Sequence, residues 1–218
     1  MSTIYKIFEC PNCKNPMSNG INLSVLHFGG KLYSDGIRIA PHIKEFPEIT
    51  KCKKCNSLFS LSNINYKEES FIIPPSDIDQ AELLNLHNYL AILIQNDMNL
   101  SKLNSNSELY IRKNIWWGFN DRLRNNEALF QDDKSGFFDE IFEETLWKSN
   151  LNRLLEIMPF NTDDQKIAIA EINRNLGNFD ECLRLMQSLN IHFAWIKSHF
   201  VFECKRENTK LFLLSNEG

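Results

Sequence analysis

The sequence lacks an apolar stretch long enough to cross a membrane. A transmembrane helix needs about 20 consecutive apolar residues, and the most apolar stretch, 83–94, is interrupted by Asn85, His87 and Asn88. The N-terminus also lacks the basic and then apolar pattern of a signal peptide, because residues 1–8 are mixed in character and run directly into a cysteine pair. These absences predict a cytoplasmic protein that makes no membrane contact.

The sequence also lacks the short motifs that carry common enzyme chemistries. It has no Gly-rich phosphate loop, no Gly-x-Ser-x-Gly elbow and no His-Glu-x-x-His motif. An enzyme reading therefore has to rest on less specific clusters of polar and aromatic residues.

A strong excess of basic charge is missing as well. The formal net charge is -4; residues 1–75 carry nine Lys/Arg and six Asp/Glu, and the rest of the chain carries fifteen and twenty-two. This difference indicates two regions, but it is too mild for the electrostatic footprint of a typical nucleic-acid-binding protein.

Two Cys-x-x-Cys pairs are the most specific feature present. Four thiolates from Cys10, Cys13, Cys52 and Cys55 are typical of a tetrahedral Zn²⁺ site. Four protein ligands leave no open coordination position, so such a zinc ion stabilises the fold and does not activate water. The sequence therefore predicts structural Zn²⁺. Metal-free thiols and a redox dithiol are the alternatives, and His27 and His42 are possible but unneeded additional ligands.

Turn signals predict β-hairpins between and beside the cysteine pairs. Gly29-Gly30 suits a tight turn joining strands at 21–28 and 31–33, and Asp35-Gly36 marks another turn before 37–40. A further strand is expected at 58–61. The residue after each second cysteine often has a left-handed backbone, which Asn56 accepts better than Lys14. We therefore expect Asn15, not Lys14, to adopt that conformation in the first turn.

On these residues, positions 1–66 resemble the zinc-ribbon superfamily, with Cys-Pro-Asn-Cys near one end and Cys-Lys-Lys-Cys near the other. The 38 residues between Cys13 and Cys52 exceed the usual spacing of about 15–20, which implies an inserted hairpin. Residues 33–36, 39–41 and 52–55 are also similar to bacterial proteins that join such a ribbon to a helical C-terminal half. That similarity implies no activity.

Zinc ribbons often bind nucleic acid, and three lysines surround the second cysteine turn. Lys51, Lys53 and Lys54, with Phe59 and Tyr66 downstream, are residue types that contact phosphate and stack on bases. The same lysines are equally well explained as compensation for the negative charge of a zinc–thiolate cluster.

The remainder of the chain predicts helices. Pro74-Pro75 indicates a boundary, Ser76 is a candidate N-cap for a helix of about 20 residues, and Thr162 with Gln165 forms a capping box. The fold class is therefore α+β: a zinc-stapled β-hairpin module over 1–73, followed by an all-α module over 76–218. Further helices are expected at 108–125, 138–158, 163–176, 179–189 and 193–205, and an apolar tail at 210–214 must dock.

Residues 170–183 resemble the turn of a tetratricopeptide-like helical hairpin, which would span about 162–190. Cys182 stands where that pattern has alanine, so we expect it, like Cys204, to be a small core residue. No second copy occurs at a 34-residue period, so a superhelix is not expected.

One helix carries a dense aromatic and polar cluster. Trp117, Asn120, Asp121 and Arg122 form a candidate ligand or partner surface, although large aromatic residues, such as the neighbouring Trp116, more often pack helices together. The acids at 139–144 are interpreted as a solvated helix face, because no His partner follows at the spacing that a carboxylate metal site uses.

Three functions follow, in order of preference. The first is a non-catalytic zinc-containing adaptor that acts through protein–protein contacts. The second is a nucleic-acid-binding regulator that uses the ribbon, and the third is an enzyme with a site between the two modules.

Overall fold

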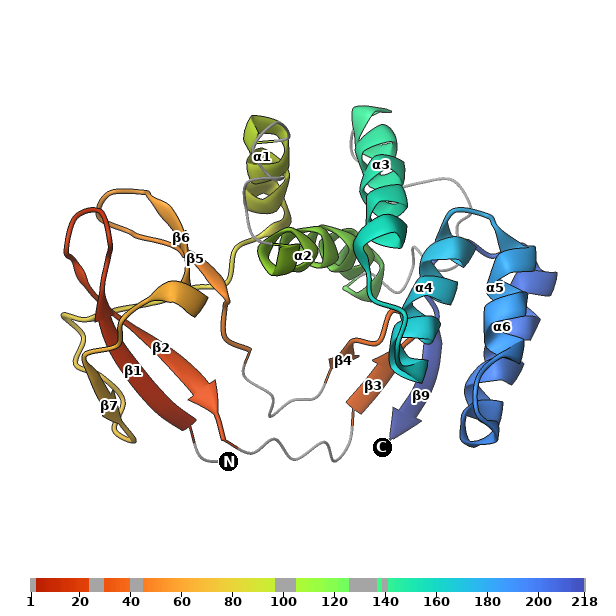
Figure 1. Ribbon diagram of the computed structural model, residues 1–218, viewed down its shortest axis with the longest axis horizontal. Helices are drawn as coiled ribbons and strands as arrows, with labels where there is room; N and C mark the ends of the chain where they lie inside the picture. The colour runs from red at the N-terminus through yellow and green to blue at the C-terminus, as the bar shows by residue number, and fades with distance from the viewer. Residues whose placement is uncertain are drawn as a thin grey trace. The chain divides into compact units, whose positions relative to one another are not determined.

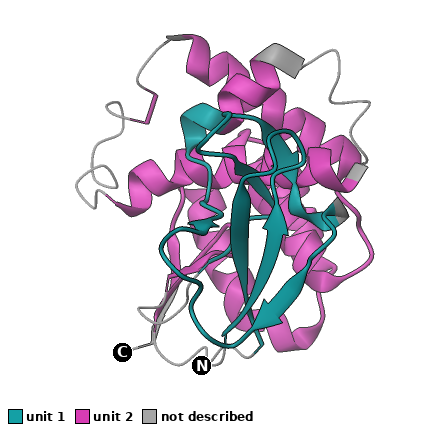
Figure 2. Cartoon of the chain, turned by 90° about the vertical axis from the view of Figure 1, so that its left-hand side faces the viewer, with its two compact units in different colours: residues 1–28, 40–88 teal, residues 29–39, 89–218 magenta. Residues whose placement is uncertain are grey.

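The computed structural model describes residues 3–23, 30–39, 45–96, 105–125, 137–138 and 141–217. Contacts divide the chain into two compact units (Figure 2): unit 1 comprises Met1–Phe28 and Ala40–Asn88, and unit 2 comprises Gly29–Ile39 and Tyr89–Gly218. Strands dominate unit 1 and helices dominate unit 2, so the chain has the α+β class that the sequence predicts. Residues 29–39 group with the helices, whereas the sequence placed them in the β module.

Unit 1 is built on a four-stranded sheet with the order β7-β1-β2-β8. The strands are β1 (Thr3–Glu9), β2 (Pro16–Asn22), β7 (Glu68–Ser70) and β8 (Asp79–Gln80). Phe8 pairs with Met17 across the antiparallel β1–β2 ladder, and both side chains are fully buried. A second ribbon, β5 (Ile49–Lys51) with β6 (Leu58–Ser60), confirms the strand expected near 58–61 and leads into the turn η1 (Leu61–Asn63).

The helix expected from Ser76 begins ten residues later. Residues 76–85 form a turn, β8 and an irregular stretch, and α1 runs over Leu86–Asn96. The backbone at 79–81 is used by the sheet: β8 pairs in parallel with β2, and the Ala81 amide donates to the Ser18 carbonyl. Asn85 starts the helix instead, since its Oδ1 accepts from the Asn88 amide at 3.0 Å.

The hairpin expected around Gly29-Gly30 is not formed by the described strands. β2 pairs with β1 and β8, whereas β3 (Gly30–Tyr33) pairs with β4 (Arg38–Ile39) and with β9 (Leu213–Glu217). Residues 24–29 lie outside the described chain. The turn at Asp35-Gly36 is confirmed: Gly36 has a φ of 83°, and its amide donates to the Tyr33 carbonyl.

The helices of unit 2 follow the sequence pattern closely. The Thr162 capping box opens α4 as predicted, and Gly177, with a φ of 81°, follows its end. The apolar tail docks as β9 beside β3 (Figure 1). The loop expected around Asp132-Asp133 lies outside the described residues. The helices are α2 (Ser105–Arg124), α3 (Ile141–Ile157), α4 (Asp163–Asn175), α5 (Phe179–Gln187) and α6 (Ala194–Lys205), with the turn η4 (Ile191–Phe193) before the last.

One hydrophobic core of unit 2 lies between α4, α5, α6 and the C-terminal strand. It includes Ile196, Phe200 and Cys204, one side of α6. None of the helices in the described part of the chain is long and apolar enough to cross a membrane.

Candidate metal centre and buried polar network

The two cysteine turns have the same backbone geometry. In the first, the Lys14 amide donates to the Cys10 carbonyl at 3.0 Å; in the second, the Asn56 amide donates to the Cys52 carbonyl at 2.8 Å. Lys14 has a φ of 61° and Asn56 a φ of 60°. The expectation that Asn15 would adopt the left-handed conformation is therefore wrong. The amide that must donate back to the first cysteine belongs to residue 14, so Lys14 takes the strained conformation.

The four sulfur atoms converge within unit 1. All four lie within 4.8 Å of one another. The Cys10 and Cys55 sulfurs are 3.7 Å apart, as are those of Cys13 and Cys52. Four sulfurs at the Zn–S distance of about 2.3 Å, placed at the corners of a tetrahedron, are separated by about 3.8 Å. The thiols are free, and their spacing is far longer than a disulfide bond of about 2.05 Å. The cluster therefore fits a single metal ion.

Local hydrogen bonds and desolvation shift the pKa values of two of the thiols, Cys55 and Cys13, in opposite directions. The Ser57 hydroxyl lies 3.0 Å from the Cys55 sulfur, and the hydroxyl and the Ser57 amide hold the pKa of Cys55 at about 5. At Cys13 the Asn15 amide lowers the pKa, but desolvation and the neighbouring sulfurs outweigh it and raise the pKa to about 12. Thiolates this close repel one another, and a bound cation relieves that repulsion.

The surroundings of the cluster are apolar. Phe8, Met17, Leu61 and Ala81 form a buried core with Cys10 and Cys52. Phe59 and Tyr66 pack edge-on against the Phe8 ring, at centroid distances of 6.1 and 5.9 Å. They serve the core here, although both were candidates for base stacking. His27 and His42 lie outside the described residues.

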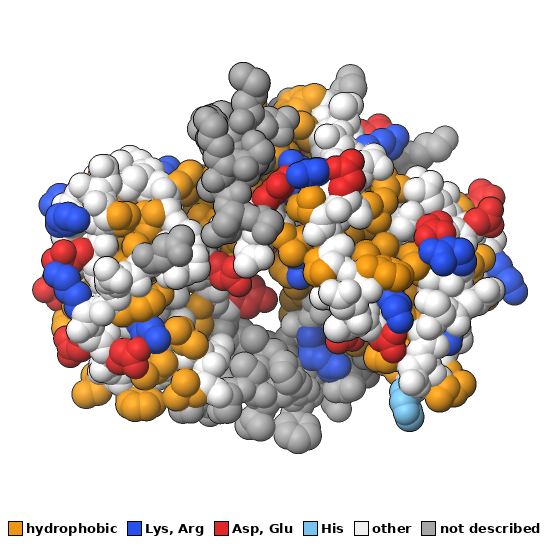
Figure 3. Space-filling view, viewed as in Figure 1, with side chains coloured by type: hydrophobic (Ala, Val, Ile, Leu, Met, Phe, Trp, Pro, Cys, Tyr) orange, Lys and Arg blue, Asp and Glu red, His pale blue; other side chains and the backbone are white. Residues whose placement is uncertain are grey.

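The three candidate nucleic-acid-binding lysines are exposed around the second turn. Lys53 pairs with Glu82 at 2.7 Å, a contact that raises the pKa of the lysine. A depression of about 290 Å³ is lined by Lys51, Lys53, Glu82 and neighbouring residues. On the face of unit 1 seen in Figure 3, basic and acidic side chains are interspersed and not gathered by sign.

The candidate surface on α2 makes contacts within unit 2. The Trp117 indole donates to the Asp35 carbonyl at 3.3 Å, and the Asn120 amide donates to the Asp35 carboxylate at 2.8 Å. Asp121 accepts from Arg124 at 2.7 Å. Trp116 is fully buried and donates to Asn175 at 2.9 Å. These contacts are those of a packing surface.

Arg122 is held in the same way. Its guanidinium donates two hydrogen bonds to the Glu143 carboxylate, at 2.7 and 2.9 Å, and another to the Phe137 carbonyl. Glu143 belongs to the acidic run at 139–144, and Glu144 pairs with Lys148 on the same helix. Asp139 and Glu140 lie outside the described residues.

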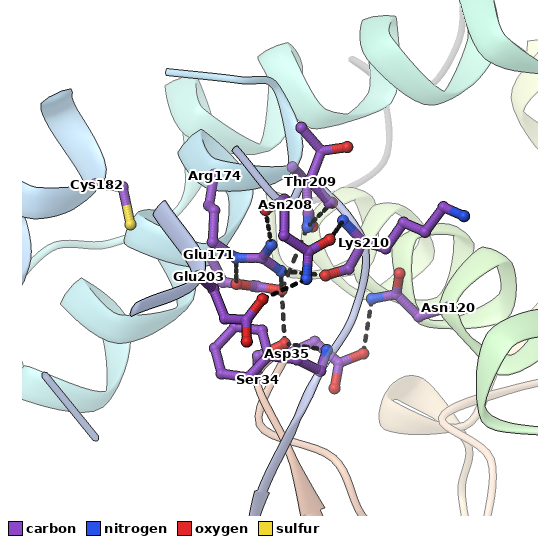
Figure 4. A network of polar contacts seen from close by, with 12 residues as sticks. Ser34, Asp35, Asn120, Glu171, Arg174, Cys182, Glu203, Asn208, Thr209 and Lys210 are labelled. Atoms are coloured by element: carbon purple, nitrogen blue, oxygen red, sulfur yellow. Dashed lines mark hydrogen bonds and ion pairs between the residues drawn. The ribbon is translucent and has the colours of Figure 1, made fainter. Parts of the chain in front are cut away.

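A buried polar network that the sequence did not reveal is centred on the turn between β3 and β4 (Figure 4). Asp35 pairs with Arg124 at 2.7 Å, and both side chains are almost fully buried. Ser34 donates to Glu171 at 2.7 Å, while its own hydroxyl accepts from the Phe212 amide. The turn is thereby attached to α2, to α4 and to the C-terminal segment.

Glu171 and Arg174 form the second half of this network. Arg174 donates twice to the Glu171 carboxylate, at 2.8 and 2.6 Å, and also to the carbonyls of Asn208 and Lys210. Burial raises the pKa of Glu171, while the Arg174 guanidinium and the Ser34 hydroxyl oppose that effect. The partners of these groups come from the chain itself, so the network stabilises the fold. In the sequence, this network is indicated only by the charged residues Glu171 and Arg174, which occupy positions of α4 where the helical spacing predicts apolar residues.

Cys182 and Cys204 are buried in the core of unit 2, as expected, with their sulfurs 3.6 Å apart. Of the predicted site residues, the structure thus brings together the four cysteines of unit 1, and it places the α2 cluster in internal contacts. Comparison with protein-family models, with curated proteins and with solved structures returns no match for this chain.

Proposed function

We propose that this chain is a non-catalytic binding or adaptor protein whose zinc-ribbon-like unit 1 is held together by structural Zn²⁺ and which works through protein–protein contacts. The observation that carries the proposal is the four-cysteine cluster. Its sulfurs are spaced for tetrahedral coordination, and a metal with four thiolate ligands has no position left for substrate or water.

Zinc is the metal that this donor set favours. Four thiolates in tetrahedral geometry suit Zn²⁺ or an iron–sulfur centre, and a single ion matches sulfur spacings of 3.7 Å. Reduced thiols and a thiolate-bound metal also support a cytoplasmic location.

The cluster on α2 does not support an enzymatic function. It consists of Trp117, Asn120, Asp121 and Arg122. These residues pair with Asp35, Arg124 and Glu143 inside unit 2. Exposed apolar side chains support a binding role instead, since contiguous apolar surface often marks interaction sites. Phe71, Ile72 and Ile73 are 69%, 78% and 74% exposed.

Two measurements test the proposal. Elemental analysis of purified protein should find one zinc per chain, and chemical crosslinking in the source cells followed by purification of the full chain should recover a defined protein partner in a fixed ratio. Zinc below half occupancy under metal-replete conditions, or a chain that crosslinks to no partner, would contradict it.

Nucleic-acid binding through the ribbon is a second candidate. Lys51 and Lys54 are exposed on the second cysteine turn. If they bind phosphate, affinity for single-stranded DNA or RNA should fall steeply with salt, and Lys51→Ala/Lys54→Ala should reduce the slope by about two. A salt-independent signal, or no binding at low ionic strength, excludes this candidate.

A further inference from the structure

The outward side of α6 presents aromatic and cationic side chains in a single row. We define the α6 stripe as Trp195, His199, Phe202 and Arg206. At 100° per residue these four positions fall within about 60° of one another around the helix. Trp195 is 45% exposed and Phe202 is 56% exposed. Ile191, four residues earlier in the turn η4, is 76% exposed.

The stripe lies away from the core of unit 2. The buried side of α6 is formed by Ile196, Phe200 and Cys204, which pack in the hydrophobic core. The middle of the stripe is about 130° around the helix from the middle of this buried side. Its members support one another: the Trp195 and His199 rings meet edge-on with centroids 6.5 Å apart, and the Arg206 guanidinium lies 5.3 Å from the centre of the Phe202 ring.

The spacing of the stripe suits a helical partner. Steps of four, three and four residues are those of an a/d seam, along which a second helix packs its own side chains. Trp195 and Phe202 occupy one class of seam position, and His199 and Arg206 occupy the other. Aromatic residues and arginine are also the types enriched where binding energy concentrates.

The charged residues around the stripe indicate the sign of the charge that the partner helix should carry. Lys205 and Arg206 are exposed, and Lys205 lies at a position that flanks the seam. The one carboxylate within α6, that of Glu203, is 13% exposed, accepts from Asn208 at 2.6 Å and lies 3.9 Å from the Arg206 guanidinium, whose side chain remains 64% exposed. Glu207 is exposed but follows the end of the helix, where the backbone turns with a φ of 52°.

We infer that the α6 stripe docks an acidic amphipathic helix of a partner protein, with apolar side chains against Trp195 and Phe202 and carboxylates facing Lys205 and Arg206. This inference rests on the proposed adaptor function and names the partner class. The contact would be helix against helix, over the length of α6.

The test uses the full chain and a displayed library of helical scaffold proteins, in which one helix face is randomised at its seam and flanking positions. Clones are selected on the wild-type chain and counter-selected on the Trp195→Ser/Phe202→Ser double variant. The enriched clones should carry apolar residues at the seam and Asp or Glu beside it. Either single substitution should weaken their binding about tenfold or more, and Arg206→Glu should weaken acidic clones while admitting lysine-bearing ones.

Phe142→Ser is the matched control, because Phe142 is also an exposed aromatic residue on a helix of unit 2 and is 50% exposed. It should leave the binding of selected clones unchanged. Enriched clones that are basic or uncharged, or that bind the double variant equally well, overturn the inference. A concentration-dependent dimer that Phe202→Ser abolishes also overturns it, since the occupant is then a second copy. If a native partner crosslinks equally to the double variant, the inference fails and the adaptor function stands.

Discussion

Lys14 is a lysine in a backbone conformation that usually belongs to glycine. Its φ of 61° is needed so that its amide can point back to the Cys10 carbonyl. For a residue with a Cβ atom the left-handed region costs roughly 1–2 kcal/mol, whereas glycine adopts it freely but loses more entropy on folding.

We expect Lys14→Gly to stabilise unit 1 by about 0.5–1 kcal/mol, the balance of these two effects. Release of metal from the proposed site during urea unfolding measures this, because the four cysteines all lie in unit 1. Lys54→Gly is the control: Lys54 is not among the residues with positive φ, so the same change there should be destabilising. Equal effects of the two substitutions would contradict the argument.

The cysteine cluster gives a second prediction at this scale. Cys55→Ser should abolish stoichiometric metal binding and destabilise unit 1, because structural zinc supplies roughly 10–16 kcal/mol of apparent binding free energy in finger peptides. Elemental analysis and the thermal melting of unit 1 measure the change.

Cys182→Ala provides the control for that experiment, since this thiol lies in the core of unit 2. The variant should retain a full complement of metal. If Cys55→Ser binds as much metal as Cys182→Ala, the four-sulfur site is wrong.

Single residues were predictable from sequence where a local rule fixes them. Two-residue spacing identifies the four cysteines that the structure brings together, and Thr162 with Gln165 identifies a helix start. Lys14 was missed because residue preference argued against a conformation that the hydrogen bond to Cys10 requires. The buried network was missed because its contacts of Asp35 with Arg124 and of Ser34 with Glu171 join residues that are distant in sequence.

At the scale of secondary structure, the turn between β3 and β4 is attached to α2 by a buried ion pair. Asp35→Ala should leave the Arg124 guanidinium buried without its main partner and cost about 3–5 kcal/mol. Asp121→Ala removes a second carboxylate from the same guanidinium, but its side chain is 50% exposed, so the cost should stay below about 1 kcal/mol. Urea unfolding followed by helical circular dichroism compares the two. Equal losses would mean that the Asp35 pair has no special role.

The junction of α2 and α3 should respond to acid. Hydrogen bonds from Arg153 and Arg112 hold the pKa of Glu108 below its ordinary value. A depressed pKa stabilises the fold above the unfolded value of about 4.3, and this contribution is lost as the pH falls through the folded pKa. Glu108→Gln should therefore be less stable than wild type near neutral pH, by about 1–2 kcal/mol.

The two proteins should converge in stability well below pH 4, where Glu108 is protonated in both the folded and the unfolded chain. Urea unfolding across this range gives the difference directly. A difference that does not vary with pH would show that the ion pairs are not its source.

Helices and strands were predicted with unequal success for a physical reason. Helices α2 to α6 were predicted well because the signals that indicate a helix, the spacing of apolar residues and the capping residues, lie within the helix or directly beside it. The stretch after Ser76 has the composition of a helix start, yet its backbone completes the sheet edge beside β2. The partner of β3 is β9, near the other end of the chain, and no local pattern indicates such a pairing.

For the whole molecule, the four-cysteine cluster lies in unit 1 and helices α2 to α6 lie in unit 2, so the stabilities of the two units should separate. Removal of the metal with a chelator should unfold unit 1, whose small core surrounds the cysteines, while the helical circular dichroism of unit 2 is largely kept. Limited proteolysis of the chelated protein should then cut first within residues 45–75. Loss of the helical signal together with the metal would show that the two units unfold as one.

The order of synthesis has a consequence for how unit 2 is completed. The residues of β3 leave the ribosome well before those of their partner strand β9, because Tyr33 pairs with Leu213, 180 residues later along the chain. The Ser34 hydroxyl likewise cannot accept its hydrogen bond from the Phe212 amide until residue 212 has been synthesised. Until β9 has been synthesised, the nascent chain therefore exposes an unpaired edge of β3, and such an edge in an incompletely folded chain is prone to aggregation.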